Sequence, residues 1–372
     1  MTESIDIVIV AHEIFPRIAP RSFRATELAK ALAKKGHNVT LLASLGEFDY
    51  FNFETKYGIK IKDLGTSRFA TSNSSGPIKL PLWKLGFIYF LRKLIEFPSI
   101  FLMRRVKKAI ISENKFDLLI TVAVPYPIHW GASLISKKNR NFQTWISDCG
   151  DPYMFNSIKK PFFYYKYLEK FWCKKTDYIS VPILTAKESY YEEFRDKIKI
   201  IPQGFNFDEI RLNYYIKNKI PTFIYAGLFY PNKRDPSNFL KYLMELNKDF
   251  KFIVFTHKST LLEPFKEKLG DKLEINKSIS RDNLILKLSS ADFLINIKNK
   301  QIANQSPSKL IDYSLTRRPI LNVSSDFTSQ EKEDFTSFMN SDYSNSIHIK
   351  DLKPYDALNV ADKFINLHID NE

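Results

Sequence analysis

A strand–helix–strand pattern near the end of the chain limits the possible folds more than any other feature of the sequence. Residues 291–297 and 319–323 are short apolar runs typical of buried strands, and residues 306–313 between them begin like a helix. Ser306 is a favourable N-cap residue, and Pro307 suits the first helical position. Strands joined by a helical crossover pair in parallel. The pattern therefore predicts an α/β fold with a parallel sheet.

The start of this helix is also a candidate anion site. It follows directly after a parallel strand, where free backbone N–H groups and the positive end of the helix dipole meet. Ser308 and Asp312 are four residues apart, so they share one face of the helix. An anion site beside a carboxylate that can bind hydroxyls suits a nucleotide, with its phosphates at the helix start and its ribose further along.

The same kind of pattern occurs in both halves of the chain. Apolar runs at 5–10 and 39–43 flank a helical segment at 23–35, for which Ser22 is the expected cap, and a new series of strands begins at 223–227. A chain of 372 residues is too long for one ordinary core. We therefore predict two Rossmann-like domains, followed by a terminal helix that returns to the first; the boundaries are 1–205, 206–352 and 353–372.

The net charge of +15 is distributed unevenly. Residues 1–200 carry 32 Lys and Arg against 19 Asp and Glu, which accounts for +13 of the total. A basic half beside a nearly neutral half indicates different partners, and nucleic acid or an anionic membrane surface would suit the basic half. Near residues 80–110, large aromatic residues alternate with Lys and Arg. This segment fits either a helix pair packed on the core with solvated charges or a face that lies on an anionic bilayer.

Other features bear on compartment and metal content. The two cysteines, Cys149 and Cys173, cannot make a disulfide framework, which favours a reducing compartment. The cysteines and histidines do not have the spacing of zinc ligands. The amino terminus has no basic region before its short apolar run, so we expect no signal peptide. The sequence predicts a cytoplasmic protein without a bound metal.

Four motifs in the same order resemble the retaining glycosyltransferases of the GT-B fold, specifically family four of the sequence-based classification. The resemblance covers nearly the whole chain. It rests on Arg24–Leu32 with Lys35–Thr40, Ile198–Asn206, Tyr225–Gly227 with Lys233–Pro236, and Pro307–Tyr313 with Arg318–Leu321. It implies two domains that face each other across a cleft, and transfer of a sugar from a nucleotide-diphosphate donor with retention of anomeric configuration.

The resemblance also implies donor-site residues in the second half. Lys233 and Arg234 would neutralise the donor diphosphate during catalysis, with an ordinary basic loop as the alternative. Asn304 and Asp312 stand where family members usually carry two glutamates separated by seven residues, and Leu228 stands where a basic residue is usual. The residues implied to bind the donor are Gly227, Ile279, Asn304, Ser306, Pro307, Ser308, Lys309 and Asp312.

In the first half, the resemblance implies an acceptor site. Asp148 and Asp151 stand at the matching strand end as catalytic candidates, although an aspartate at such a place can also simply form a turn. Arginine suits bidentate phosphate contacts. The candidates for acceptor or phosphate contact are His12, Arg21, Ser22 and Arg24.

The resulting hypothesis is a hexosyltransferase of cell-surface polysaccharide synthesis. It would be peripheral on the inner face of the cell membrane and act on a glycan, for example one carried by a polyprenyl diphosphate lipid. One alternative is a GT-B nucleotide-sugar epimerase, which would share the nucleotide site. A second is a basic nucleic-acid-binding protein, although the sequence contains no recognised nucleic-acid-binding motif.

Overall fold

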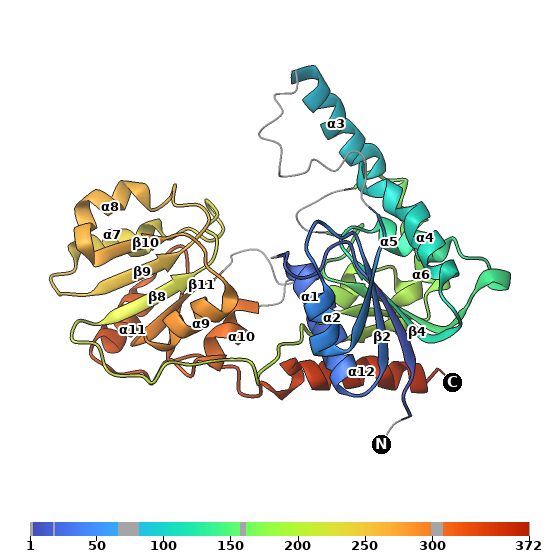
Figure 1. Ribbon diagram of the computed structural model, residues 1–372. Coiled ribbons are helices and arrows are strands. Elements are labelled where there is room, and N and C mark those ends of the chain that lie inside the picture. Colours follow the sequence, from blue (N-terminus) through green and yellow to red (C-terminus); the bar gives the residue numbers. More distant parts are fainter. Residues whose placement is uncertain (1–2, 18, 66–81, 157–160, 299–307, 372) are drawn as a thin grey trace. The chain divides into compact units, whose positions relative to one another are not determined.

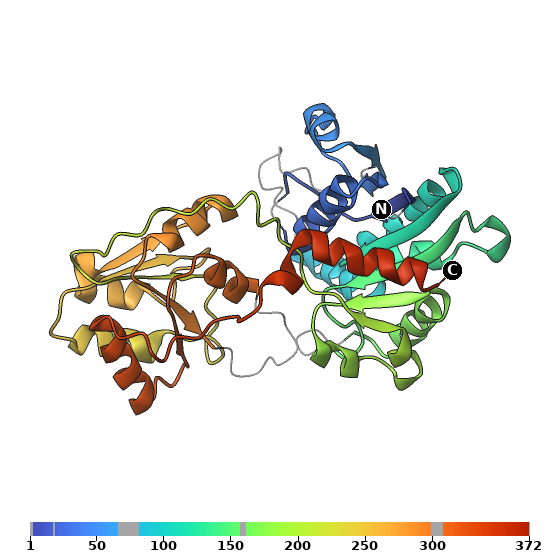
Figure 2. The same cartoon turned by 90° about the horizontal axis from the view of Figure 1, so that it is seen from below.

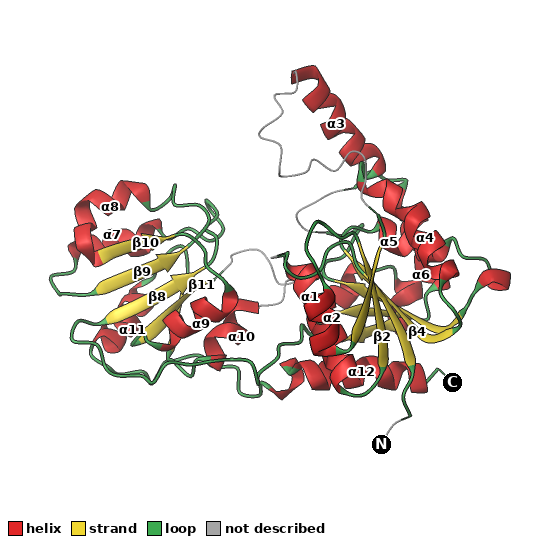
Figure 3. Ribbon diagram, in the orientation of Figure 1, coloured by secondary structure: helices red, strands yellow, loops and turns green. Residues whose placement is uncertain are grey.

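The computed structural model describes residues 3–17, 19–65, 82–156, 161–298 and 308–371. They form two compact α/β units, each built on one parallel sheet with helices on its faces (Figures 1 and 3). Among the described residues, unit 1 contains 3–206 and 354–371, and unit 2 contains 207–298 and 308–353. The predicted α/β fold with two parallel sheets is therefore observed.

Unit 1 is centred on a seven-stranded sheet. Its order is β3 (Ile59–Asp63), β2 (Asn38–Ala43), β1 (Asp6–Val10), β4 (Phe116–Ala123), β5 (Phe142–Cys149), β6 (Tyr178–Val181) and β7 (Ile198–Ile200). All neighbouring strands are parallel. The chain builds the sheet outward from β1 in one direction and then from β4 in the other, so the order reverses between these two strands.

Alternation along β1 explains why helices cover both faces of this sheet. Ile7 and Ile9 join a core with α1 (Pro20–Lys34) and α12 (Ala357–Ile369), whereas Val8 and Val10 point into the core on the opposite face. That second core contains side chains of α4, α5 and α6. The remaining helices of the unit are α2 (Phe51–Tyr57), α3 (Leu82–Ile95), α4 (Leu102–Ser112), α5 (Pro127–Ser133) and α6 (Tyr165–Lys175).

The terminal helix α12 belongs to unit 1. Val360 and Phe364 are buried in the core beneath α1, and the view in Figure 2 shows α12 lying along this unit. His368 near its end places Nδ1 3.0 Å from Oγ1 of Thr144 on β5. The predicted return of the last helix to the first domain is therefore observed.

Two local predictions for unit 1 were wrong. Helix α1 begins at Pro20 with Ala19 as its N-cap, because Pro20 is favourable at the first helical position. Ser22 therefore lies inside the helix, where its hydroxyl donates to the Arg17 carbonyl at 2.7 Å. The sequence also predicts one helix over residues 185–194, whereas the structure has parts of two 3₁₀ helices there, Leu184–Ser189 and Glu192–Lys197.

Unit 2 is centred on a five-stranded sheet. The strand order is β10 (Leu273–Asn276), β9 (Lys251–Phe255), β8 (Thr222–Ala226), β11 (Phe293–Ile297) and β12 (Ile320–Val323), all parallel. Its helices are α7 (Ser237–Glu245), α8 (Glu263–Leu269), α9 (Arg281–Ser289), α10 (Ser308–Leu315) and α11 (Ser329–Met339). Stacked phenylalanines fill one side of the core, with the rings of Phe223 and Phe293 5.0 Å apart.

The helix predicted between the last two strands of unit 2 is α10. The structure describes it from Ser308, so the predicted cap Ser306 and first-turn Pro307 lie outside the described residues. In the described part of the chain, no helix is both long enough and apolar enough to cross a membrane.

Candidate functional site

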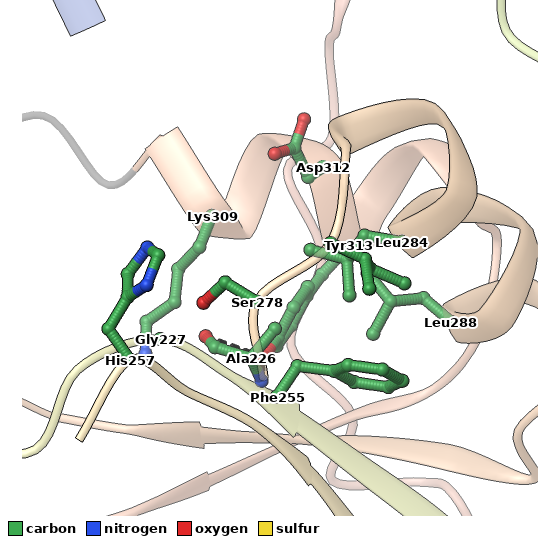
Figure 4. Close-up of a pocket in the computed structure, with 11 residues that line it drawn as sticks. Ala226, Gly227, Phe255, His257, Ser278, Leu284, Leu288, Lys309, Asp312 and Tyr313 are labelled. Carbon is green, nitrogen blue, oxygen red and sulfur yellow. Dashed lines mark hydrogen bonds between the residues drawn. The ribbon is translucent and has the colours of Figure 1, made fainter. Parts of the chain in front are cut away.

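A pocket of about 250 Å³ opens at the carboxyl edge of the unit 2 sheet (Figure 4). The ends of β8, β9 and β10 meet there with α10, close to the reversal of strand order between β8 and β11. In open α/β sheets, ligands bind outside the carboxyl ends of the strands at such a switch point. The lining residues are Ala226, Gly227, Phe255, His257, Ser278, Ile279, Leu284, Leu288, Lys309, Asp312 and Tyr313.

The pocket has an apolar side and a polar side. Phe255, Leu284 and Leu288 lie together on one side, whereas Lys309 and His257 lie on the other. A flat apolar ring and a charged group could therefore bind at the same time, one on each side.

Tyr313 fixes α10 to the sheet. Its buried hydroxyl accepts a hydrogen bond from the Ala226 N–H at the end of β8, at 2.7 Å. Because Lys309 and Asp312 lie on the same short helix, this bond sets their positions relative to the sheet edge.

Lys309 carries a buried ammonium group. Its Nζ has no hydrogen-bond partner among the described residues and lies 4.3 Å from the centre of the Tyr225 ring. Burial lowers the pKa of Lys309 well below its usual range, and the charge of Arg234 lowers it further. An ammonium that has lost its hydration and has no counter-ion is a strong binding group for an anion.

Gly227 leaves room for that ammonium. Its φ of 142° is rarely adopted by residues with a side chain, and a Cβ there would lie 3.3 Å from the Tyr225 hydroxyl and 3.7 Å from Lys309 Nζ. Any larger residue would crowd the charged side of the pocket.

Arg234 supplies a second basic group near Lys309. It follows β8 in a tight turn in which Arg234 and Tyr230 exchange backbone hydrogen bonds of 2.9 and 3.1 Å. Its Nε is buried and has no hydrogen-bond partner in the described part of the chain. Lys233 and Arg234 are both half-buried, and neither is among the residues that line the pocket. The charge that acts on Lys309 is that of Arg234, so Arg234 is the one of the two that lies near the Lys309 ammonium.

Asp312 lies one turn further along α10 and pairs with Arg281. Both Nε and Nη2 of Arg281 donate to Asp312 Oδ1, at 2.9 and 2.7 Å. Burial raises the pKa of the Asp312 carboxyl above its usual value, and Arg281 only partly offsets this effect. Asp312 is therefore a largely buried acid held in place by one arginine.

The predicted donor residues are only partly visible at this pocket. Gly227, Ile279, Lys309 and Asp312 line it. The side chain of Ser308 is not described, and Asn304, Ser306 and Pro307 lie outside the described residues.

The sequence prediction missed several pocket residues. His257 and Ser278, which line the pocket, follow the ends of β9 and β10, and Arg281, which pairs with Asp312, follows β10 at the start of α9. Their position after a strand is the signal that could have identified them. Tyr225 and Tyr313 carried no such signal, because aromatic residues in strands and helices usually belong to the core.

In unit 1, Asp148 is buried between two arginines. Arg24 donates to both carboxylate oxygens, at 2.9 and 3.2 Å, Arg21 also pairs with Asp148, and the Ser180 hydroxyl donates at 2.6 Å. The arginines hold the pKa of Asp148 well below its usual range, even though burial acts in the opposite direction.

Arg24 connects this ion pair to neighbouring segments. It is 2% exposed, its guanidinium donates to the Pro202 carbonyl, and it lies 5.2 Å from the centre of the Phe364 ring on α12. The burial of Arg24 and Asp148 favours a structural role for both over the ligand contacts considered from the sequence.

The other predicted residues of unit 1 differ in accessibility. Asp151 follows β5, is half-buried, and its carboxylate makes no hydrogen bond or ion pair with any described residue. His12 follows β1 and is also half-buried, and burial lowers its pKa below the usual value. Ser22 is buried within α1, whereas Arg21 remains 21% exposed beside Gly150. Asp151, His12 and Arg21 therefore remain available to a ligand.

Among the described residues, no three His, Cys, Asp or Glu side chains lie close enough together to hold a metal ion.

Comparison with known proteins identifies the fold. No family model matches the chain, and no curated protein matches its sequence. A glycosyltransferase from Rickettsia africae superposes over 100% of this chain and 99% of its own, with a TM-score of 0.61 at 14% identity. Anabaena HepE, solved with UDP and glucose, covers 98% of both chains with a TM-score of 0.57 at 8% identity.

A third similar structure is TarM of S. aureus, solved with UDP and α-GlcNAc-glycerol. It covers 99% of this chain and 93% of its own, with a TM-score of 0.57 at 10% identity. At such identities the likeness concerns the fold, which is the two-domain GT-B arrangement of glycosyltransferases. The predicted GT-B fold class is therefore confirmed.

Proposed function

We propose that this protein is a glycosyltransferase that binds a nucleoside-diphosphate sugar in the pocket of unit 2. The observation that carries the proposal is the buried ammonium of Lys309, which has no counter-ion among the described residues and lies near the second cation, Arg234. Two neighbouring cations that have no carboxylate partner among the described residues, at a switch point, suit a diphosphate. The fold shared with solved glycosyltransferases supports the same function.

The chemistry of the pocket suits a departing nucleotide. When the bond between the sugar and the diphosphate breaks, negative charge accumulates on the diphosphate oxygens, and fixed cations nearby stabilise that charge. Lys309 and Arg234 would supply this stabilisation. Asp312 would accept a hydrogen bond from the ribose, and the nucleobase would lie against the apolar side formed by Phe255 and Leu288.

Transfer would proceed with retention of configuration. The departing phosphate oxygen would take the proton of the acceptor hydroxyl on the same face of the sugar, so no side-chain nucleophile is needed. The basic residues would make a metal ion unnecessary. The sequence resemblance to retaining glycosyltransferases supports both parts of this mechanism.

The acceptor would be a glycan bound by unit 1, for example one on a polyprenyl diphosphate lipid. Asp151 is the preferred contact for the acceptor hydroxyl, because its carboxylate is unpaired among the described residues whereas Asp148 is held by two arginines. Arg21 and His12 are the further candidates near strand ends of this unit.

Unit 1 would also bind the inner face of the cell membrane. Helix α3 projects from the unit (Figure 1) and exposes Phe87, Tyr89 and Phe90 at 58, 60 and 51%, next to Arg92 and Lys93. Exposed aromatic rings among basic residues suit the interface of an anionic bilayer, where each basic residue contributes about 1 kcal/mol. This arrangement would place the enzyme close to a lipid-linked acceptor.

A donor screen tests the proposed function. Sugar nucleotides of uridine, guanosine, adenosine, cytidine and thymidine would each be added during thermal unfolding, because a ligand that binds the folded state raises its melting temperature. We expect one base series to stabilise the protein, and incubation with isolated bacterial membranes to transfer its sugar to lipid or glycan. If no sugar nucleotide stabilises the protein and no sugar is transferred, the proposal fails.

A further inference from the structure

The contacts between Arg281 and Asp312 are one-sided. Both hydrogen bonds from the guanidinium converge on Oδ1, at 2.9 and 2.7 Å, and Oδ2 has no partner among the described residues. The two side chains are 23 and 18% exposed, so neither is a freely solvated surface charge. Arg281 opens α9 and Asp312 lies on α10, so the pair also connects two helices that border the pocket.

This geometry limits how the carboxylate can bind a ribose. A carboxylate with two available oxygens can accept hydrogen bonds from both hydroxyls of a vicinal diol. In this site Oδ1 already accepts two bonds from Arg281, whereas Oδ2 can still accept a hydroxyl proton. Rotation that would bring Oδ1 to the ligand would break at least one charge-assisted bond in a partly buried place, which is costly.

We propose that Arg281 is a positioning residue that holds Asp312 so that the nucleotide site recognises one ribose hydroxyl and not the pair. This inference rests on the proposed function, because it concerns the same pocket. In this role Arg281 need not touch the nucleotide itself. The site would therefore bind one of two nucleotides, the 2′-deoxy or the 3′-deoxy form, much more tightly than the other.

Arg281 would also favour the ionised form of Asp312. The other titratable or charged groups that line the pocket are Lys309 and Tyr313 on α10 and His257 after β9. Arg281 is the group that favours the charged carboxylate form of Asp312. Without Arg281, the effect of burial would no longer be partly offset, and Asp312 would take up a proton at higher pH than in the wild-type protein. A protonated Asp312 would no longer offer an anionic acceptor to the ribose.

The test measures calorimetric affinities of the full-length protein for UDP, 2′-deoxy-UDP and 3′-deoxy-UDP, with the GDP series used if UDP does not bind. We expect one deoxy analogue to bind about 10-fold or more weaker than the other, as for the loss of a hydrogen bond to a charged group. Arg281→Gln should reduce that preference to about 3-fold or less and shift the acid limb of the affinity profile to higher pH. Arg281→Lys should restore part of the preference, because an ammonium can still donate to Oδ1.

Lys287→Gln is the matched control, because it removes a positive charge from the exposed side of the same helix and should leave the preference unchanged. Equal binding of the two deoxy analogues by the wild-type protein would overturn the inference. So would an unchanged preference and pH profile in Arg281→Gln. If neither diphosphate series binds, both the proposed function and this inference fail. If a diphosphate binds but its two deoxy analogues bind equally, this inference alone fails. If Arg281→Gln does not fold, the wild-type comparison and Arg281→Lys still decide the matter.

Discussion

Lys309 illustrates how a single residue can favour function at the expense of stability. In the unfolded chain its ammonium is hydrated and has the usual lysine pKa, whereas in the folded protein burial lowers that pKa well below the usual range. The folded state therefore gives up the lysine proton at a lower pH than the unfolded state does. Under the linkage relation, the unfolding free energy contributed by this residue rises as the pH rises toward the usual lysine pKa.

We predict that Lys309→Gln makes the free protein more stable and its nucleotide site weaker. Removal of the buried charge should raise the midpoint of urea unfolding at pH 7, whereas affinity for a nucleoside diphosphate should fall about 10- to 100-fold, as for a lost hydrogen bond to a charged group. Urea titration and calorimetry measure the two effects separately. A variant that is less stable and binds normally would show that Lys309 is only a packing residue.

Glu169 is a buried acid outside the proposed site. It is fully buried on α6, and its Oε2 has no partner in the described part of unit 1. Burial raises the pKa of Glu169 to about 7, although hydrogen bonds from the backbone at Met154 and Tyr153 act against this shift. Because the folded state holds the proton up to higher pH than the unfolded state, stability should fall as pH rises from the usual glutamate range to about 7.

We predict that Glu169→Gln flattens this part of the stability profile. The pKa of Glu169 differs by about 2.5 pH units between the folded and the unfolded state, which corresponds to roughly 3 kcal/mol of unfolding free energy at pH 8. The variant and the wild type should have similar unfolding free energies near pH 5, and the variant should be the more stable at pH 8. Parallel pH profiles for the two proteins would contradict this account.

At the scale of elements, some helices could be read from the sequence and others could not. The strands of both sheets stood out as apolar runs bounded by polar residues, and α10 stood out because it lies between two of them. Helices α7, α8 and α11 were not predicted from the sequence. For α11 the signal was present: Thr328 accepts a bond from the Glu331 N–H, and the Glu331 side chain accepts from the Thr328 N–H.

We predict that Thr328→Ala destabilises unit 2 by about 1 kcal/mol, because the substitution removes the hydroxyl half of this capping box. Urea unfolding of the full chain measures the change. Ser329→Ala is a suitable control, because this neighbour is exposed and does not cap the helix. Equal losses in the two variants would mean that the cap contributes nothing specific.

The aromatic surface of α3 makes a prediction at the same scale. Phe87→Ser with Phe90→Ser should weaken retention on vesicles of anionic lipid, because both rings are exposed and would lie in the bilayer interface. Flotation of the protein with vesicles of phosphatidylglycerol, compared with phosphatidylcholine, measures this retention.

Tyr214→Ser in unit 2 is the control for the vesicle experiment, since that ring is 91% exposed on a different unit. We expect the α3 variant alone to lose retention, and added salt to reduce retention of the wild type. Full retention of the α3 variant would exclude this helix as the membrane contact. Retention on DNA in place of vesicles would favour the nucleic-acid alternative.

For the whole molecule, the parts predicted best were those set by chain periodicity. Two successive α/β patterns, a break near residue 205 and a final amphipathic helix predicted the two-sheet fold. The site was predicted less completely, because it depends on which loops the topology brings together. Arg281 is 31 residues away from Asp312 in the sequence, and the separation alone does not indicate that they pair.

The acidic residues of unit 1 show the same limit. Asp148 and Asp151 look alike in the sequence, as both lie at the end of one strand. In the structure one is buried between arginines and the other is unpaired among the described residues. The packing of α1 against β5 helps to separate them, and that contact joins residues more than one hundred positions apart.

Calorimetric titration of the purified protein with UDP, GDP and ADP tests the central claim most directly. The claim is that the pocket around Lys309 and Asp312 binds a nucleoside diphosphate. We predict that one of the three binds at micromolar concentrations, that its monophosphate binds at least about 10-fold weaker, and that Lys309→Gln removes this difference. The exposed Lys332→Gln should bind like the wild type. If none of the three diphosphates binds, or if Lys309→Gln binds the diphosphate as tightly as the wild type, the claim is contradicted.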